Sequence, residues 1–287
     1  MLSAIESAAS AVLADLIWLN TADIFTAFGV ARSAPLRGPL ELLCRPPARR
    51  FARQLARLDA LVGAEGLGTG GAWMAGQLRA RLELRGPPPP ASGPLLILAN
   101  HPGLLDAASI FAAIPRRDLR VLAADRPFLR ALPNISAHLI AVGLGPAERT
   151  AAVREAARHL RGGGALLSFP AGQIEPDPCA LPGAADSLAT WSSSIDLFAR
   201  IAKDAAIVPV IVGGVLAPSA LSHPLTRLRR APRDRQWLAA IIQLIWPRHF
   251  PTHVRVQIGR PIVAGRDPVS ASVAAEARRL IAEVARP

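Results

Sequence analysis

The sequence predicts an α/β protein with a largely parallel (mixed) sheet of about seven strands, covered by helices on both faces, and a helical N-terminal appendage. Short apolar runs typical of buried strands alternate with stretches of helical periodicity. That alternation is typical of a parallel sheet. The 287 residues suffice for one large α/β domain and a smaller appendage. Hydrophobic residues make up 51 %, which excludes a disordered chain.

Residues 1–75 form the predicted appendage. An apolar pattern at helical spacing over residues 2–28 predicts one or two amphipathic helices, either packed on the rest of the protein or lying in a membrane surface. Residues 32–57 contain seven Arg and one Glu, so this stretch is either a solvated helix face or a docking face for anionic headgroups. The glycine-rich residues 63–71 predict a flexible joint before the domain of residues 76–287.

The predicted elements of that domain follow from periodicity and from Pro/Gly boundaries. Predicted strands are apolar runs at 81–85, 95–99, 119–124, 138–142, 165–169, 206–212 and 254–258. Predicted helices cover 72–80, 104–113, 126–132, 147–161, 187–203 and 237–246, with an irregular basic segment at 216–235. A last helix is expected to begin with Asp267 as N-cap and Pro268 as its first residue.

Residues 95–106, LLILANHPGLLD, predict a buried strand, a tight turn and the start of a helix. His101 lies at the turn, and Asp106 lies one helical turn further on. A histidine can act as a general base because its ordinary pKa, about 6.5, is close to neutral pH. A neighbouring carboxylate can orient the ring and stabilise the imidazolium. The alternative is a turn histidine and a solvated helix aspartate, because the spacing alone has low specificity.

A second stretch, LLSFPAGQIE at residues 166–175, also ends an apolar run in a proline–glycine turn. In open parallel sheets, ligands bind at the carboxyl ends of strands. His101 and residues 169–172 each follow a predicted strand. We therefore expect the two turns to form one site.

Together these stretches resemble the glycerolipid acyltransferase family of the lysophosphatidate type, over residues 80–265. The residues from His101 to Asp106 match the family's HxxxxD block, and the FPAG of residues 169–172 matches its FPEG block. Residues 207–210 and 254–262 resemble the fourth block and the closing strand. The resemblance implies His101 and Asp106 as catalytic residues. It implies substrate-binding residues close to them: Asn100, Gly103, Phe169, Pro170, Ala171, Gly172, Gln173 and Pro209.

The resemblance implies O-acyl transfer from a thioester to the hydroxyl of a lysolipid or a glycerol-phosphate-like acceptor, in membrane lipid synthesis. His101 would take the hydroxyl proton directly, without a covalent enzyme intermediate. The donor would be acyl-CoA or acyl carrier protein, as a co-substrate, and no metal or other cofactor is required. The alternative is a catalytically silent peripheral membrane protein of the same fold that binds lipid.

Two departures from the family pattern bear on the acceptor. Ala171 stands where the family often has a carboxylate; Glu175 could replace it, although a solvated glutamate is the favoured alternative. Residues 139–147 contain no basic residue, where glycerol-phosphate enzymes carry an arginine for the acceptor phosphate. FPAG with Asp186 and Trp191 is more similar to the hemolysin-like branch, which includes ornithine-lipid acyltransferases. This favours a lyso-aminolipid or another lysolipid.

The net charge of +12 favours an anionic membrane surface as partner. Nucleic acid is disfavoured, because the chain has no Tyr and few Phe to interleave with its basic residues. No strongly apolar 18-residue stretch is free of charge, so no membrane-spanning helix is expected. Cys44 and Cys179 predict neither a disulfide nor a zinc site. We expect a cytoplasmic protein, peripherally associated with the inner face of the cell membrane.

Overall fold

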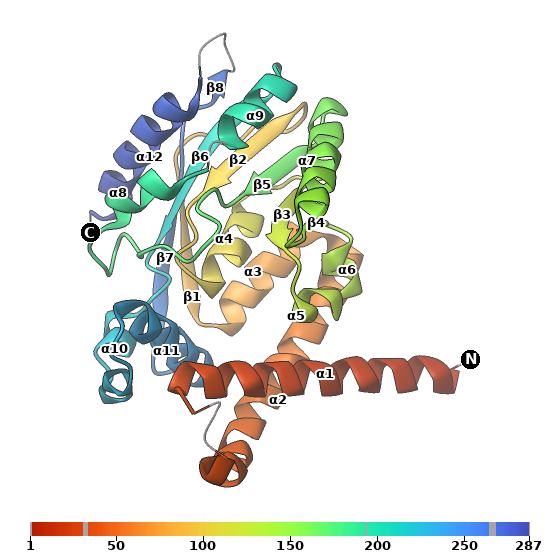
Figure 1. Ribbon diagram of the computed structural model, residues 1–287, viewed down its shortest axis with the longest axis vertical. Helices are drawn as coiled ribbons and strands as arrows, with labels where there is room; N and C mark the ends of the chain where they lie inside the picture. The colour runs from red at the N-terminus through yellow and green to blue at the C-terminus, as the bar shows by residue number, and fades with distance from the viewer. Residues whose placement is uncertain (1, 31–33, 193, 264–267, 287) are drawn as a thin grey trace.

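The computed structural model describes residues 2–30, 34–192, 194–263 and 268–286. One sheet lies at its centre, in the order β1-β7-β6-β2-β5-β3-β4, with β8 paired to β6 (Figure 1). The strands are β1 (Ala80–Arg85), β2 (Leu95–Ala99), β3 (Arg120–Ala124), β4 (Leu139–Val142), β5 (Ala165–Ser168), β6 (Ala206–Gly213), β7 (Thr252–Ile258) and β8 (Ile262–Val263). The β6–β7 and β6–β8 pairs are antiparallel and the other pairs are parallel. The predicted α/β class and mixed sheet are confirmed.

Helices cover both faces of the sheet (Figure 1). They are α1 (Leu2–Phe28), α2 (Ala34–Glu65), α3 (Leu67–Gln77), α4 (Leu104–Ala113), α5 (Pro127–Arg130), α6 (Pro133–Ser136), α7 (Pro146–Arg161), α8 (Ala184–Ser187), α9 (Ser194–Ile201), α10 (Pro218–Leu221), α11 (Pro232–Ile245) and α12 (Ser270–Val284). Short 3-10 helices lie at Leu188–Thr190 and Pro224–Leu228. Across the described ranges, no helix combines the length and apolarity needed to cross a bilayer.

Strand β2 is buried on both faces, which explains why its sequence is an unbroken apolar run. Leu95 and Ile97 belong to the same core cluster as buried residues of α3 and α4. Leu96 and Leu98 belong to a second cluster, with buried residues of α7, α9 and α12. The central strand is therefore held from two sides, and the turn at its carboxyl end begins from a fixed position.

The N-terminal helices share the core of the sheet. Leu16 of α1 and Phe51 and Leu55 of α2 belong to the same buried cluster as Leu95 and Ile97. The sequence left two placements open for the first helix, packed on the protein or lying in a membrane surface. The described part of α1 has one face packed on the protein. Its other face includes Trp18, which is 70 % exposed. A domain division at residue 75 stays a prediction.

The predicted flexible joint at residues 63–71 is wrong. Helix α2 continues to Glu65 and α3 begins at Leu67, so the break is a single residue, Gly66. Gly71 serves close packing instead: a Cβ at this position would lie 2.3 Å from the carbonyl oxygen of Ala108 in α4. A glycine here lets α3 and α4 approach each other. From the sequence alone, a run of glycines predicts flexibility, because glycine has the widest choice of backbone conformations.

Several predicted helices differ from the structure, and the one at 237–246 begins at Pro232, inside the segment expected to be irregular. The expected helix at 187–203 is divided into α8, a 3-10 turn and α9, because Trp191 adopts an extended backbone between them. The last helix begins at Ser270 rather than Pro268. The Ser270 N–H is capped from another helix, by Asp196 Oδ1 at 3.0 Å, so it needs no cap from its own segment. The predicted N-cap, Asp267, lies outside the described residues.

Candidate active site

The turn after β2 is tied to the neighbouring strand β6 through Asn100. The Asn100 side chain is buried; its Nδ2 donates to the Val212 carbonyl at 2.9 Å, and its Oδ1 accepts from the Val212 N–H at 2.8 Å. The Asn100 side chain thus makes the two hydrogen bonds to β6 that a further residue pair of the sheet would make. It fixes the position at which the chain leaves β2. Its predicted role in substrate binding stays a prediction.

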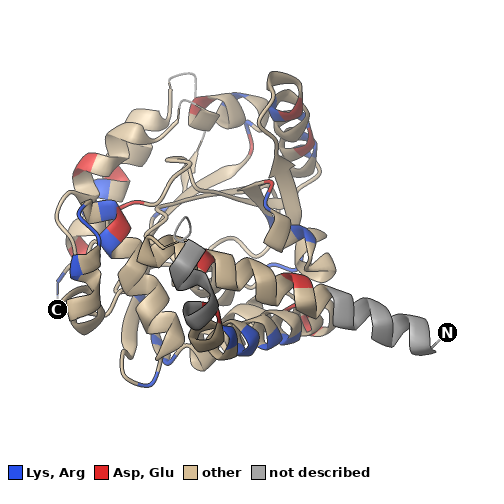
Figure 2. Ribbon diagram, turned by 60° about the horizontal axis from the view of Figure 1, so that its bottom comes forward, with Lys and Arg blue, Asp and Glu red and all other residues tan. Residues whose placement is uncertain are grey.

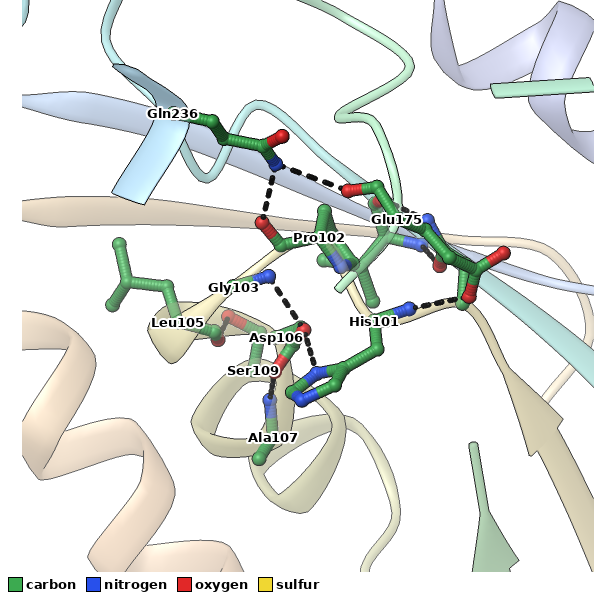
Figure 3. A network of polar contacts seen from close by, with 11 residues as sticks. His101, Pro102, Gly103, Leu105, Asp106, Ala107, Ser109, Glu175 and Gln236 are labelled. Atoms are coloured by element: carbon green, nitrogen blue, oxygen red, sulfur yellow. Dashed lines mark hydrogen bonds and ion pairs between the residues drawn. The ribbon is translucent and has the colours of Figure 1, made fainter. Parts of the chain in front are cut away.

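His101 and Asp106 meet at the start of α4 (Figure 3). His101 Nδ1 lies 2.7 Å from Asp106 Oδ2, and the side chain of Asp106 is 1 % exposed while that of His101 is 32 % exposed. Asp106 Oδ2 also accepts from the Gly103 N–H at 2.8 Å, and Oδ1 accepts from the Ala107 N–H. Gly103 has φ 152°, a backbone conformation that favours glycine. The carboxylate is therefore held by the backbone and can orient the imidazole.

The contact with Asp106 determines which tautomer the neutral imidazole of His101 adopts. A carboxylate at Nδ1 favours the tautomer with its proton on Nδ1, so Nε2 carries the free lone pair. Burial lowers the pKa of His101, but the charge and hydrogen bond of Asp106 and the charge of Glu175 raise it, and the net shift is upward. Nε2 is then the ring nitrogen that can accept a proton.

The second predicted segment lies beside the first. Strands β2 and β5 pair in parallel with Leu98 opposite Ser168, so Phe169 follows β5 at the level where the chain turns towards His101. The Phe169 ring packs on the imidazole, with 4.7 Å between centroids. The structure thus brings together the two turns that the sequence placed in one site.

The other predicted substrate-binding residues are more dispersed. Pro170 is buried, Ala171 is half-buried, and Gly172 and Gln173 are exposed. Pro209 is buried inside β6, opposite Leu98, rather than at the carboxyl end of its strand.

Glu175 corrects a sequence-based expectation. The favoured alternative was a solvated glutamate, but Glu175 is 2 % exposed. Its Oε2 accepts from the backbone N–H of His101 at 2.9 Å, and its Oε1 accepts from Ser187 Oγ and from Trp191 Nε1, each at 2.9 Å. Burial raises the pKa of Glu175, and the three donors offset this only in part. A buried carboxylate is costly unless it is hydrogen-bonded, and this one is bonded on both oxygens.

Gln236, on α11, is a site residue that sequence reasoning missed. It is buried, and its Nε2 donates to the carbonyl oxygens of Pro102 at 3.3 Å and Glu175 at 3.0 Å (Figure 3). No local pattern marks it, because its partners are 134 and 61 residues away along the chain. Asp186, which the sequence grouped with Trp191, is exposed.

A small, largely apolar pocket of about 20 Å³ adjoins the turn. It is lined by Leu78, Gly103, Leu105, Val215, Leu216, Ala240, Gln243 and Leu244. Such a volume holds about one water molecule.

No protein-family model and no curated protein matches the chain. Among solved structures, it is similar to the 1-acyl-sn-glycerophosphate (LPA) acyltransferase PlsC from Thermotoga maritima. The two are 18 % identical with a TM-score of 0.49, and the match covers 96 % of this chain and 95 % of that one.

Proposed function

We propose that this protein is an O-acyltransferase that moves a fatty acyl group from a thioester to the hydroxyl of a lysolipid. The observation that carries the proposal is the His101–Asp106 pair, 2.7 Å apart at the carboxyl end of the central strand. The pair lies beside the turn at Phe169, in the order and spacing of the acyltransferase blocks that the sequence resembles.

The mechanism follows from the free Nε2 of His101. A hydroxyl is a weak nucleophile at neutral pH, and a positioned base contributes about 10²- to 10⁴-fold to such a step. Nε2 takes the hydroxyl proton while the oxygen attacks the thioester carbonyl. A C–O bond forms, the C–S bond breaks, and the imidazolium returns its proton to the leaving thiolate. Asp106 balances the positive charge of the ring during the step.

The donor in this proposal is acyl-CoA or acyl carrier protein, and the acceptor is a lysolipid whose recognition does not depend on a phosphate held after β4. The residues directly after β4 are Gly143, Leu144 and Gly145, and Leu144 is 90 % exposed. This apolar, uncharged stretch supports a lyso-aminolipid or a similar acceptor over glycerol phosphate.

We also propose that the protein works as a cytoplasmic protein bound to the inner face of the cell membrane. Basic residues form a row along α2 (Figure 2). The basic face of α2 is defined by four exposed arginines, Arg45, Arg49, Arg53 and Arg57. Leu42 and Leu43 of the same helix are 77 % and 72 % exposed. Cationic and apolar side chains together suit anionic headgroups.

The test is acyl transfer to lysolipids in vesicles, with radiolabelled acyl-CoA or acyl carrier protein as donor. The wild-type protein should form diacyl product, and His101→Ala should form none, while the exposed Asp186→Asn should retain activity. A His101→Ala protein with near wild-type turnover would falsify the mechanism. Vesicle binding without product from any donor would support the silent lipid-binding alternative instead.

A further inference from the structure

One residue holds both backbone polar groups of His101. The N–H of His101 donates to Glu175 Oε2 at 2.9 Å, and the carbonyl oxygen of His101 accepts from the Glu175 N–H, also at 2.9 Å. Glu175 comes from the segment after β5, so these bonds cross between the two turns of the site. The peptide that carries the imidazole is thereby fixed independently of the Asp106 contact.

Glu175 is itself held from three further directions. Ser187 and Trp191 donate to its Oε1, and Gln236 donates to its carbonyl oxygen. The His101 N–H and Trp191 Nε1 can only donate to the carboxylate, which is what an ionised carboxylate requires. The Ser187 hydroxyl has one proton and two acceptors in reach, Glu175 Oε1 at 2.9 Å and the Ala184 carbonyl oxygen at 2.8 Å. These hydrogen bonds therefore offset the cost of burying the Glu175 carboxylate.

We propose that Glu175 is a positioning residue for the general base: its carboxylate fixes the backbone of His101 and places a second negative charge beside the imidazole. This inference rests on the proposed acyl transfer. Asp106 then orients the ring, and Glu175 orients the peptide from which the ring extends. The role is distinct from a contact with substrate, because Glu175 is 2 % exposed.

Loss of the Glu175 carboxylate should affect catalysis in two ways, through the position of His101 and through the charge near its ring. A misplacement of a catalytic group by about 1 Å can cost about 10²-fold in rate. Glu175 also contributes to the pKa of His101, which burial lowers and which Asp106 and then Glu175 raise. Asp106 and Glu175 are the charged groups that act on this ring. Removing the charge at Glu175 should therefore lower the pKa of His101.

The decisive variant is Glu175→Gln. Glutamine has one acceptor oxygen, so either the His101 N–H or the Ser187 and Trp191 donors lose their acceptor. We expect kcat to fall about 10- to 10²-fold, with KM for both substrates within about 3-fold of wild type. The acid limb of the pH–rate profile should move to lower pH.

The matched control is Asp59→Asn. Asp59 is also buried, and its carboxylate accepts from the Ile135 N–H at 2.8 Å and Asn134 Nδ2 at 2.9 Å, at the contact of α2 with α6. Neutralising it removes a buried negative charge away from the His101 turn. We expect wild-type kcat and an unchanged acid limb. An equal effect in both variants would overturn the inference, because it would show a general response to losing a buried charge.

An NMR titration of the His101 ring separates this inference from the proposed function, because it needs no turnover. The His101 signal is assigned by its loss in His101→Asn. Wild-type protein without acyl transfer refutes the proposed function, whereas a lower His101 pKa in Glu175→Gln alone still supports the positioning role. Wild-type kcat and an unshifted His101 pKa in Glu175→Gln overturn it.

A second variant covers the case in which Glu175→Gln does not fold. Trp191→Phe keeps the ring and removes one donor to Glu175 Oε1. The expected result is a loss of kcat of about 3- to 10-fold, the equivalent of one hydrogen bond. If Glu175→Gln is unfolded, a Trp191→Phe protein with wild-type kcat overturns the inference.

Discussion

The imidazole of His101 packs on the ring of Phe169, with 4.7 Å between the ring centroids and 34° between their planes. The first ring follows β2 and the second follows β5, so this contact joins the two turns of the candidate active site. The imidazole therefore has two neighbours, the carboxylate of Asp106 at Nδ1 and the ring of Phe169.

Phe169→Ala should lower kcat/KM about 2- to 10-fold, because such an aromatic pair contributes about 0.5–1.5 kcal/mol beyond simple burial. Phe169→Leu keeps apolar volume without the ring and should lie between the alanine variant and wild type. Steady-state acyl transfer with a lysolipid acceptor measures both. Equal kcat/KM in all three proteins would show that Phe169 does not restrain His101.

Asp106→Asn should lower kcat about 10³- to 10⁴-fold, and the Gly103 N–H loses its acceptor where the amide nitrogen replaces Oδ2. The asparagine amide would donate to Nδ1 of His101 and favour the tautomer with the proton on Nε2, which cannot accept the substrate proton. The control is Asp186→Asn, at an exposed aspartate. A variant that keeps more than a tenth of wild-type kcat would assign the base function elsewhere.

The pH–rate profile should have an acid limb above the ordinary histidine value. Burial lowers the pKa of His101, and Asp106 and Glu175 more than offset this, so the net shift is upward. A general base must be unprotonated, so activity is lost as pH falls through the raised pKa and is full above it. The measurement is kcat/KM from about pH 5 to 9. An acid limb below about 6.5 contradicts the prediction.

Asp177→Ala should destabilise the fold by about 3–5 kcal/mol. Asp177 is fully buried and accepts from the backbone N–H groups of Cys179 at 2.9 Å, Gly214 at 2.8 Å and Leu216 at 3.0 Å. Alanine leaves all three donors without this acceptor. Urea unfolding followed by circular dichroism measures the loss, and Asp186→Ala should change stability by less than about 0.5 kcal/mol.

Neutralising the basic face of α2 should weaken binding to anionic vesicles. The double variant Arg53→Gln/Arg57→Gln should bind about ten-fold more weakly in a sedimentation assay, with less effect at high salt. The control is Arg154→Gln/Arg158→Gln, which removes the same charge from exposed positions of α7. Equal losses in the two double variants would show that net charge, rather than the α2 face, drives binding.

The sequence predicted the central strand and the His101–Asp106 pair well, because both depend on local patterns. Strand β2 is an unbroken apolar run, and the turn and helix start after it are encoded within seven residues, from Asn100 to Asp106. The rule that ligands bind at the carboxyl ends of parallel strands predicted that the two turns lie together, and the pairing of β2 with β5 brings them together.

The supporting contacts could not be predicted, because their partners are distant in the sequence. Glu175 meets His101 across 74 residues, and Asn100 meets Val212 across 112. Because glutamate is polar, the sequence favoured a solvated side chain for Glu175. In the structure, Ser187 and Trp191 supply hydrogen-bond donors that make the burial of Glu175 possible. Gly71 was misread for a similar reason, because its close partner, Ala108, lies on another helix.

The pairing of β1 with β7 has a consequence for how the chain is made. Ala80 is paired with Thr252 and Arg85 with Gln257, so the first strand to leave the ribosome has its sheet partner among the last. Strand β1 is at the sheet edge, so during most of translation its backbone has no neighbour there. Chains released before about residue 260 would keep this strand open to pairing between molecules, and premature termination should therefore yield aggregates rather than a partly folded, separate protein.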